Sequence, residues 1–199
     1  MDYTVLRVVE AGVVLRAGHR RRFGAHAHAE FDAFSLQARP GIYVVQWLDG
    51  QLDVTVRDRP HLREGIALGR AVSPMVDGPV EKPAPPCAYD GVRRNNQATL
   101  LVDAQGRVLE ACTAAVVGWD GTQLVAVPRE APRVISTSEE ALLDAHPHRF
   151  AWFTPDVPIP LLLVNAVSGV VEPARAGPVM DAAVKAQLAA TLVATTAKR

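Results

Sequence analysis

Long hydrophobic runs, a surplus of either charge and a cysteine framework are all missing from this sequence. The longest apolar candidate, residues 159–164, has the length of a strand, whereas a membrane-spanning helix needs about 20 apolar residues. Basic and acidic residues number 21 each, so the formal net charge is zero. A neutral chain lacks the positive patch that binds nucleic acid or anionic lipid. We therefore expect neither nucleic acid nor a membrane as a partner.

Cysteine is scarce, and no export signal is visible. The two cysteines, Cys87 and Cys112, are expected to be reduced thiols because they lie in no metal-ligand spacing and follow no secretory leader. Residues 1–4 contain no charged stretch followed by an apolar one, so no signal peptide is predicted. These features favour a cytoplasmic protein.

Motifs for several common chemistries are also absent. The sequence contains no G-x-S-x-G, no G-x-x-x-x-G-K and no G-x-G-x-x-G, which leaves nucleophile-elbow hydrolases, P-loop proteins and Rossmann enzymes without support. His26 and His28 would point about 200° apart on a helix and could not share an ion. His146 and His148 have no third ligand nearby. No metal site is predicted.

Lysine is unusually rare, which narrows the choice of a reactive amine. Only three of the 21 basic residues are lysines, namely Lys82, Lys185 and Lys198. Lys185 lies in a helical pattern and Lys198 in the C-terminal tail. If the protein uses a lysine chemically, Lys82 is the good candidate.

The hydrophobic pattern predicts an α+β chain. Strands are expected at residues 3–9, 13–15, 42–48, 52–56, 66–72, 99–102, 108–111, 114–117, 124–127, 161–165 and 169–172. Helices are expected at residues 17–36, 87–95, 136–145 and 179–197. Asp49-Gly50 is a strong hairpin signal, and Ser136 with Glu139 fits a capping box. A linker at 73–79 divides the chain into a small domain, 1–74, and a larger one, 79–199.

Several polar residues are candidates for function, although each has an ordinary structural explanation. Arg22 lies near the edge of the buried stripe of the first helix, where an arginine can reach inward to an anion. Lys82 precedes a proline that holds it extended, and Glu110 ends a strand. Taken singly, these residues fit solvated side chains, just as the remaining candidates fit a helix cap or turns: Ser136, Thr137, Ser138, Asn165 and Ser168.

The order of these segments along the chain is more informative than any one of them. Seven segments are similar to known motifs: residues 3–8 to FETLRV, 19–23 to H-L-x-R-L, 82–90 to H-K-T-T-x-R-x-x-Y-D, 100–111 to LLLNEDGEVTEG, 125–128 to LLTPP, 134–143 to L-P-G-I-T-R-x-x-L-L, and 163–171 to LTNSLRGVVPV. Together they resemble the class IV aminotransferase family, which includes branched-chain and D-amino-acid aminotransferases and 4-amino-4-deoxychorismate lyase. The match covers nearly the whole chain.

The resemblance implies a fold and a cofactor. The fold is the two-domain α+β fold of fold-type IV enzymes, like that of D-amino-acid aminotransferase, in a short version without the usual N-terminal extension. The cofactor is pyridoxal 5′-phosphate (PLP). By this resemblance, Lys82 would hold the cofactor aldehyde as an imine and move the α-proton of the substrate. Glu110 would face the pyridine nitrogen of the cofactor.

The resemblance also indicates which residues would bind the cofactor phosphate and the substrate. Arg22 and the backbone N–H groups of Thr137 and Ser138 are matched to the phosphate, because a helix N-terminus attracts anions. Tyr89 would lie beside the cofactor. Asn165 and Ser168 would line the edge of the substrate pocket.

The sequence departs from the family pattern at the phosphate loop. Ser136 and Glu139 stand where the family has glycine and arginine, and Ser168 replaces an arginine at the substrate end. Glu139 and Glu140 fall in the first turn of the expected helix, where carboxylates repel a phosphate. Both side chains must therefore point away from it.

The expected activity is transamination of an amino acid or the lyase-type elimination that releases pyruvate. The lysine, glutamate and arginine are common to both reactions and do not separate them. An amino-acid-like small molecule is the expected substrate. Because the family works as homodimers, the resemblance also implies a homodimer. Two alternatives remain: a non-catalytic relative that keeps the fold without cofactor or activity, and a structural dimer module.

Overall fold

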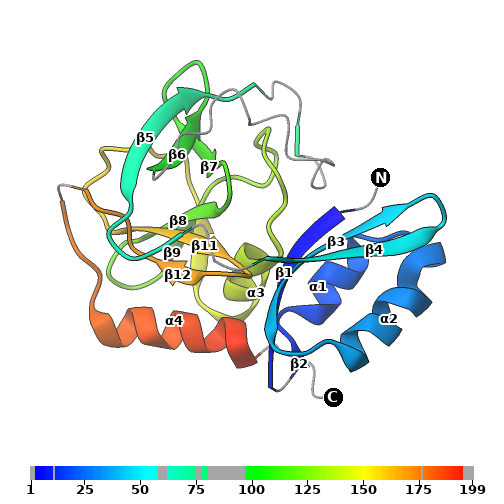
Figure 1. Ribbon diagram of the computed structural model, residues 1–199. Helices are drawn as coiled ribbons and strands as arrows, with labels where there is room; N and C mark the ends of the chain where they lie inside the picture. The colour runs from blue at the N-terminus through cyan, green and yellow to red at the C-terminus, as the bar shows by residue number, and fades with distance from the viewer. Residues whose placement is uncertain are drawn as a thin grey trace.

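The computed structural model describes residues 3–10, 12–57, 62–74, 78–79, 97–175 and 177–194. The expected helix at 87–95 lies outside these residues, as do Lys82, Tyr89 and Cys87. Figure 1 shows the described chain as two bodies of sheet and helix side by side, with helix α3 between them.

A four-stranded antiparallel sheet forms the N-terminal body, in the order β2-β1-β3-β4. Its strands are β1 (Tyr3–Val9), β2 (Gly12–Val13), β3 (Gly41–Leu48) and β4 (Gln51–Arg57). The turn between β3 and β4 has Asp49 and Gly50 at positive φ, 48° and 84°, as a tight hairpin with right-handed strand twist requires. This confirms the predicted hairpin.

The first helical segment differs from the prediction of one helix over 17–36. The structure has α1 (Arg16–Arg21), a 3₁₀ turn η1 (Ala25–Ala27) and α2 (His28–Gln37), with extended backbone at Gly24 between them. The break lets Asp32 of α2 bind both Arg16 and Arg20 of α1, at 2.6 and 3.0 Å. Of the apolar residues whose spacing suggested one helix, Phe23, Ala27 and Phe31 are buried and Phe34 is half-buried. Phe23 packs on Phe31 with ring centroids 5.2 Å apart.

The larger body contains two sheets. One is three-stranded, β5-β6-β7, with β5 (Ala67–Val72), β6 (Gln97–Val102) and β7 (Val108–Ala111). The other is five-stranded, β10-β9-β8-β11-β12, with β8 (Ala115–Trp119), β9 (Leu124–Ala126), β10 (His148–Phe150), β11 (Leu161–Asn165) and β12 (Gly169–Val171). Strand β10 was not expected from the sequence, because its three residues are exposed and carry no apolar alternation.

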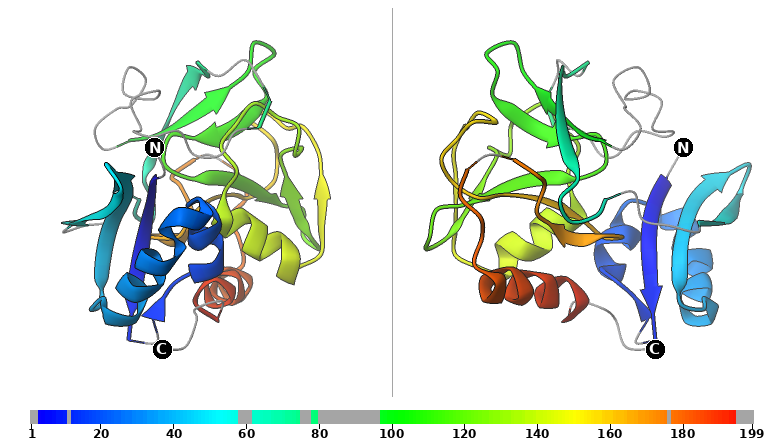
Figure 2. Two further views of the ribbon diagram at one scale, coloured as in Figure 1. Left: turned by 90° about the vertical axis from the view of Figure 1, so that its right-hand side faces the viewer. Right: turned by 60° about the vertical axis from the view of Figure 1, so that its left-hand side comes forward.

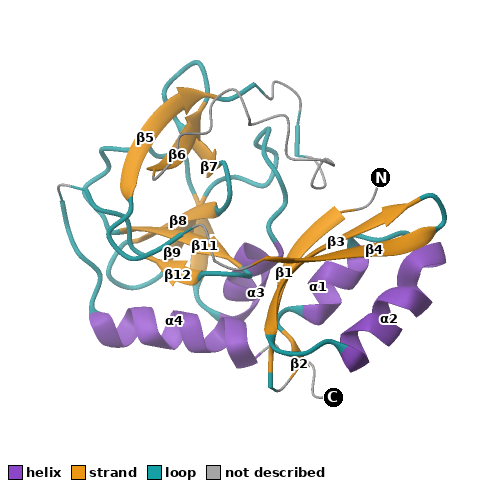
Figure 3. Ribbon diagram, in the orientation of Figure 1, coloured by secondary structure: helices purple, strands orange, loops and turns teal. Residues whose placement is uncertain are grey.

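Strand β5 pairs in parallel with β6, so it belongs to a sheet of the larger body although it precedes the predicted linker. The division into domains at 1–74 and 79–199 stays a prediction. Two helices complete this body, α3 (Thr137–Ala145) and α4 (Ala182–Ala194), and Figure 3 shows them on one side of the five-stranded sheet. Among the described residues, no helix is long and apolar enough to cross a membrane.

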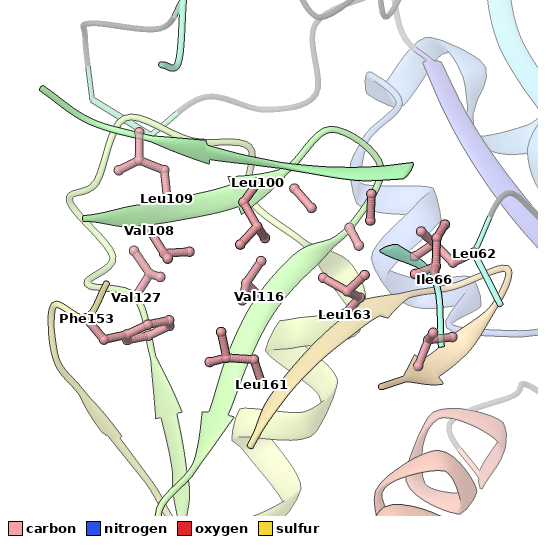
Figure 4. Close-up of a cluster of buried hydrophobic side chains, with 14 of the residues drawn as sticks. Leu62, Ile66, Leu100, Val108, Leu109, Val116, Val127, Phe153, Leu161 and Leu163 are labelled. Carbon is pink, nitrogen blue, oxygen red and sulfur yellow. The ribbon is translucent and has the colours of Figure 1, made fainter. Parts of the chain in front are cut away.

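The central strands β8, β9 and β11 of the five-stranded sheet are covered on both faces, which explains the continuous apolar run in β11. Leu161 and Leu163 pack toward β6, β7 and Phe153, as Figure 4 shows. Leu162 and Val164 point the other way, toward α3 and α4. A strand covered on both sides needs apolar residues at every position. Each fully buried leucine contributes about 1.5–3 kcal/mol of burial free energy.

Candidate functional site

The candidate site is built around the segment Val134–Ser138, which leads into α3 and is called the α3 loop below. Ser136 is the N-cap of α3, in extended conformation, and its Oγ accepts the backbone N–H of Glu139 at 3.3 Å. The predicted helix start is therefore confirmed. The first amide groups of a helix have no acceptor within it, so those of Thr137 and Ser138 can serve an anion.

Glu110 reaches the α3 loop from the sheet. It lies on β7, opposite Leu101 of β6, and is 4% exposed. Its Oε1 accepts the backbone N–H of Val134 at 3.1 Å. A carboxylate as buried as this must be hydrogen-bonded, and the bond fixes its direction relative to the loop.

Arg22 reaches the same loop from the N-terminal body. It is the C-cap residue of α1, and its Nη2 donates to the carbonyl oxygen of Ile135 at 2.6 Å. The guanidinium is also a permanent positive charge, so it can attract an anion to this loop. The structure thus brings Glu110 and Arg22, which are 88 positions apart in the sequence, to neighbouring residues of one loop.

Helix α1 and the start of α3 touch each other directly. A Cβ added at Gly18 would lie 2.9 Å from both Cβ and Cγ2 of Thr137, closer than real Cβ contacts allow. Figure 2 shows α1 beside α3 from a second direction. Gly18 therefore permits the approach that carries Arg22 to the α3 loop.

The two carboxylates of the first turn are both paired with arginines. Glu139 is bound by Arg133 through Nη1–Oε2 at 2.5 Å and Nη2–Oε1 at 3.0 Å, and both side chains are buried. Glu140 is bound by Arg21 at 3.2 Å, and the side chains of Arg21 and Glu140 are 64% and 35% exposed, respectively. Because Glu139 accepts from Arg133, the capping box is only half formed. Burial raises the pKa of the Glu139 carboxyl above its usual value, although the Arg133 guanidinium acts in the opposite direction.

Arg133 was not predicted from the sequence. It falls in a loop with no periodic pattern, and arginine is abundant throughout the chain. The available signal was Glu139 itself, because an acidic residue on the apolar side of a helix needs a nearby cation.

The substrate-side candidates lie at the β11–β12 turn. Asn165 Oδ1 accepts the backbone N–H groups of Val167 and Ser168 at 3.0 and 2.6 Å, and its Nδ2 donates to the carbonyl of Thr113 at 2.9 Å. Asn165 thus shapes the turn and ties it to the β7–β8 connection. Its role toward a substrate stays a prediction.

Two buried hydroxyls in this part of the molecule have no hydrogen-bond partner among the described residues. They are Oγ of Ser168 and Oγ1 of Thr99, which lies on β6. Buried polar atoms without a partner are uncommon in folded proteins and point to a ligand or an undescribed group. Ser168 was among the predicted site residues and Thr99 was not, because a threonine in a strand carries no special signal.

The amine predicted to be reactive lies outside the described residues. Lys82 and Tyr89 lie in residues 80–96, so their assignment stays a prediction.

No group of histidine, cysteine, aspartate or glutamate in the described ranges is arranged to hold a metal ion. His26 is exposed beside the Trp47 ring, and His148 is exposed on β10.

Comparison with known proteins gives structural likeness without sequence likeness. No protein-family model matches the sequence, and no curated protein matches it significantly. Among solved structures, 4-amino-4-deoxychorismate lyase from Pseudomonas aeruginosa superposes with a TM-score of 0.69 at 15% identity, over 96% of this chain and 88% of that one.

Two further structures are similar to the same extent. A hypothetical aminotransferase from Mycobacterium tuberculosis, in its PLP-bound form, gives a TM-score of 0.67 at 14% identity, over 98% of this chain and 88% of the other. A fold IV-transaminase from Curtobacterium pusillum gives 0.62 at 17% identity, over 96% and 83%. The chain therefore has the α+β fold of these fold-type IV aminotransferases and lyases, as the ordered motifs predicted.

Proposed function

We propose that this protein is a PLP-dependent enzyme that acts on an amino-acid-like substrate. The observation that supports this most directly is the convergence on the α3 loop of a buried carboxylate, a guanidinium and a helix N-terminus. These are the groups that the pyridine nitrogen and the phosphate of the cofactor need. They meet within a fold shared with PLP enzymes.

Each described residue has a definite task in this proposal. Arg22 and the N–H groups of Thr137 and Ser138 bind the phosphate by charge and by hydrogen bonds. Glu110, held in place by Val134, accepts a hydrogen bond from the protonated ring nitrogen. A charge-assisted bond of this kind contributes about 1.5–3 kcal/mol.

The bound cofactor supplies an electron-accepting ring that stabilises the charge left when the substrate α-proton departs. Lys82 holds the cofactor through its amine and then moves that proton. The positive charge of a bound cofactor favours the neutral amine that such a step requires. The hydroxyl of Ser168 is a candidate donor to the substrate, because it is buried with no partner in the described structure.

Two reactions fit this set of residues. One is transamination between an amino acid and a 2-oxo acid. The other is lyase-type elimination, which releases pyruvate from 4-amino-4-deoxychorismate. Assaying amino transfer and pyruvate release side by side separates them.

The test of cofactor binding is a PLP titration followed by visible absorbance. We expect a saturable band in the wild-type protein and none in Lys82→Ala. Lys185→Ala is the matched control, because that amine pairs with Glu64 at 3.1 Å on the α4 surface, and we expect it to keep the band. If the wild-type protein shows no band with excess PLP, the non-catalytic relative is the better explanation.

We further propose that the protein is a cytoplasmic homodimer, as the family resemblance implies. Sedimentation at micromolar concentration is expected to give twice the mass of the 199-residue chain. A monomer under these conditions would contradict the dimer without affecting the cofactor assignment.

A further inference from the structure

The N-terminus of α3 carries two negative charges of its own, Glu139 and Glu140. Carboxylates in this position interact favourably with the helix dipole, and they also compete with any anion that binds there. A phosphate site at this helix end therefore needs positive groups that neutralise the two carboxylates.

Arg133 meets that requirement for Glu139. The pair is bidentate, at 2.5 and 3.0 Å, and the side chains are only 7% and 4% exposed. Arg133 Nη2 also donates to the carbonyl of Val127 at 3.2 Å, which anchors the guanidinium to the end of β9. Because both charges are fixed and shielded from water, the cancellation does not depend on mobile ions.

Arg21 does the same for Glu140 in a weaker form. That pair is longer, at 3.2 Å, and exposed, so water and salt already screen the carboxylate. The chain thus contains one buried and one exposed counter-charge for adjacent carboxylates of the same helix turn.

We propose that Arg133 is a positioning residue for anion binding. It holds the Glu139 carboxylate away from the open N–H groups of α3 and neutralises it, so that a phosphate can bind at the α3 loop. This inference rests on the proposed function. It adds a residue that neither the family resemblance nor the comparisons assign.

The alternative is that the pair serves only to stabilise the fold. Removing one partner of a buried ion pair destabilises a protein in either case, because it leaves a buried charge uncompensated. A neutral double variant separates the two roles. If the Arg133–Glu139 pair only stabilises the fold, the double variant still lacks it and stays impaired. If Arg133 serves to neutralise Glu139, the double variant has no carboxylate left to repel a phosphate, and binding returns.

The experiment measures binding of PLP by absorbance and of inorganic phosphate by thermal stabilisation, at about pH 8.5, where a carboxyl without its counter-ion is more fully ionised. We expect Arg133→Gln to weaken both by at least about tenfold. We expect Arg133→Gln with Glu139→Gln to return to within about threefold of wild type. Arg21→Gln is the matched control and should change binding by less than about fivefold.

The outcomes are distinct. If the wild-type protein binds neither probe, the proposed function fails and this inference fails with it. If the wild-type protein binds and Arg133→Gln binds equally well, only the inference is overturned. The same holds if the double variant folds, by its circular dichroism and melting temperature, yet binds as weakly as the single variant.

Discussion

Gly18 shows how a residue without a side chain can bring a functional group of its own helix to another element. It lies in close contact with Thr137 at the start of α3, and its helix ends at Arg22, whose guanidinium binds the α3 loop. The backbone conformation at Gly18 is ordinary helix. Glycine is therefore needed here because a larger side chain would collide with Thr137, and not because of unusual torsion angles.

This makes Gly18→Ala an informative substitution. Alanine in a helix is normally better than glycine by about 0.5–1 kcal/mol. Here the new methyl group would meet Thr137 at 2.9 Å, and overpacking of this kind costs about 1–3 kcal/mol. We expect a net loss of stability in urea unfolding, together with weaker PLP binding.

A second substitution serves as its control. Thr137→Ser removes the Cγ2 methyl, one of the two atoms in close contact, and should recover part of the loss in the Gly18→Ala background. A Gly18→Ala protein that is more stable than wild type would show that the two helices are not held together at this point.

The site residues differ in how far the sequence could predict them. Glu110 and Arg22 were assigned by family resemblance, and the structure shows both at the α3 loop. Arg133 was not found, because its importance comes from a partner whose orientation is set only by folding. Asn165 was selected as a substrate residue, yet its described contacts are those of a turn.

At the scale of elements, the turn between β8 and β9 is held by one carboxylate. Asp120 Oδ1 accepts the N–H groups of Thr122 and Gln123 and the Thr122 hydroxyl, at 2.9–3.1 Å. Its Oδ2 accepts from Arg149 on β10 at 3.1 Å. The Thr122 N–H first, and then the other donors, hold the pKa of the Asp120 carboxyl well below its usual range.

This shift gives a pH dependence of defined sign. A carboxyl whose pKa is lower in the folded than in the unfolded protein stabilises the fold above the unfolded pKa of about 3.9, and that contribution disappears as pH falls through the folded value. We expect the stability advantage of wild type over Asp120→Asn to be full at neutral pH and to shrink toward about pH 2.

Unfolding free energies of the two proteins across this range provide the measurement. Arg149→Gln removes one of the donors and should narrow the pH-dependent difference. A difference between wild type and Asp120→Asn that stays constant at all pH values would contradict the assignment.

Elements with strong local signals were predicted well, and those fixed by tertiary contacts were not. The β3–β4 hairpin and the cap of α3 follow from Asp49-Gly50 and Ser136. The break between α1 and α2 depends on ion pairs to Asp32 that form only when the two helices turn back on each other. Strand β10 exists because its backbone pairs in parallel with β9, which no local pattern reveals.

At the scale of the whole molecule, the order of motifs predicted more than any composition or periodicity. The fold was expected from that order and is confirmed by structural likeness over 96% of the chain at 15% identity. Most side chains differ from those of this neighbour, so the likeness is one of fold. The α+β class alone would have left the site undefined.

The central claim is that Lys82 is the amine that holds the cofactor. The chain offers a clean test, because it has only three lysines, one of which, Lys185, is already paired with Glu64 and Glu172. Borohydride reduction of the PLP-loaded protein fixes the cofactor to its amine, and peptide mass mapping then locates it. We expect a single adduct on the peptide that contains Lys82. An adduct on Lys185 or Lys198 alone, or no adduct at saturating PLP, would contradict it.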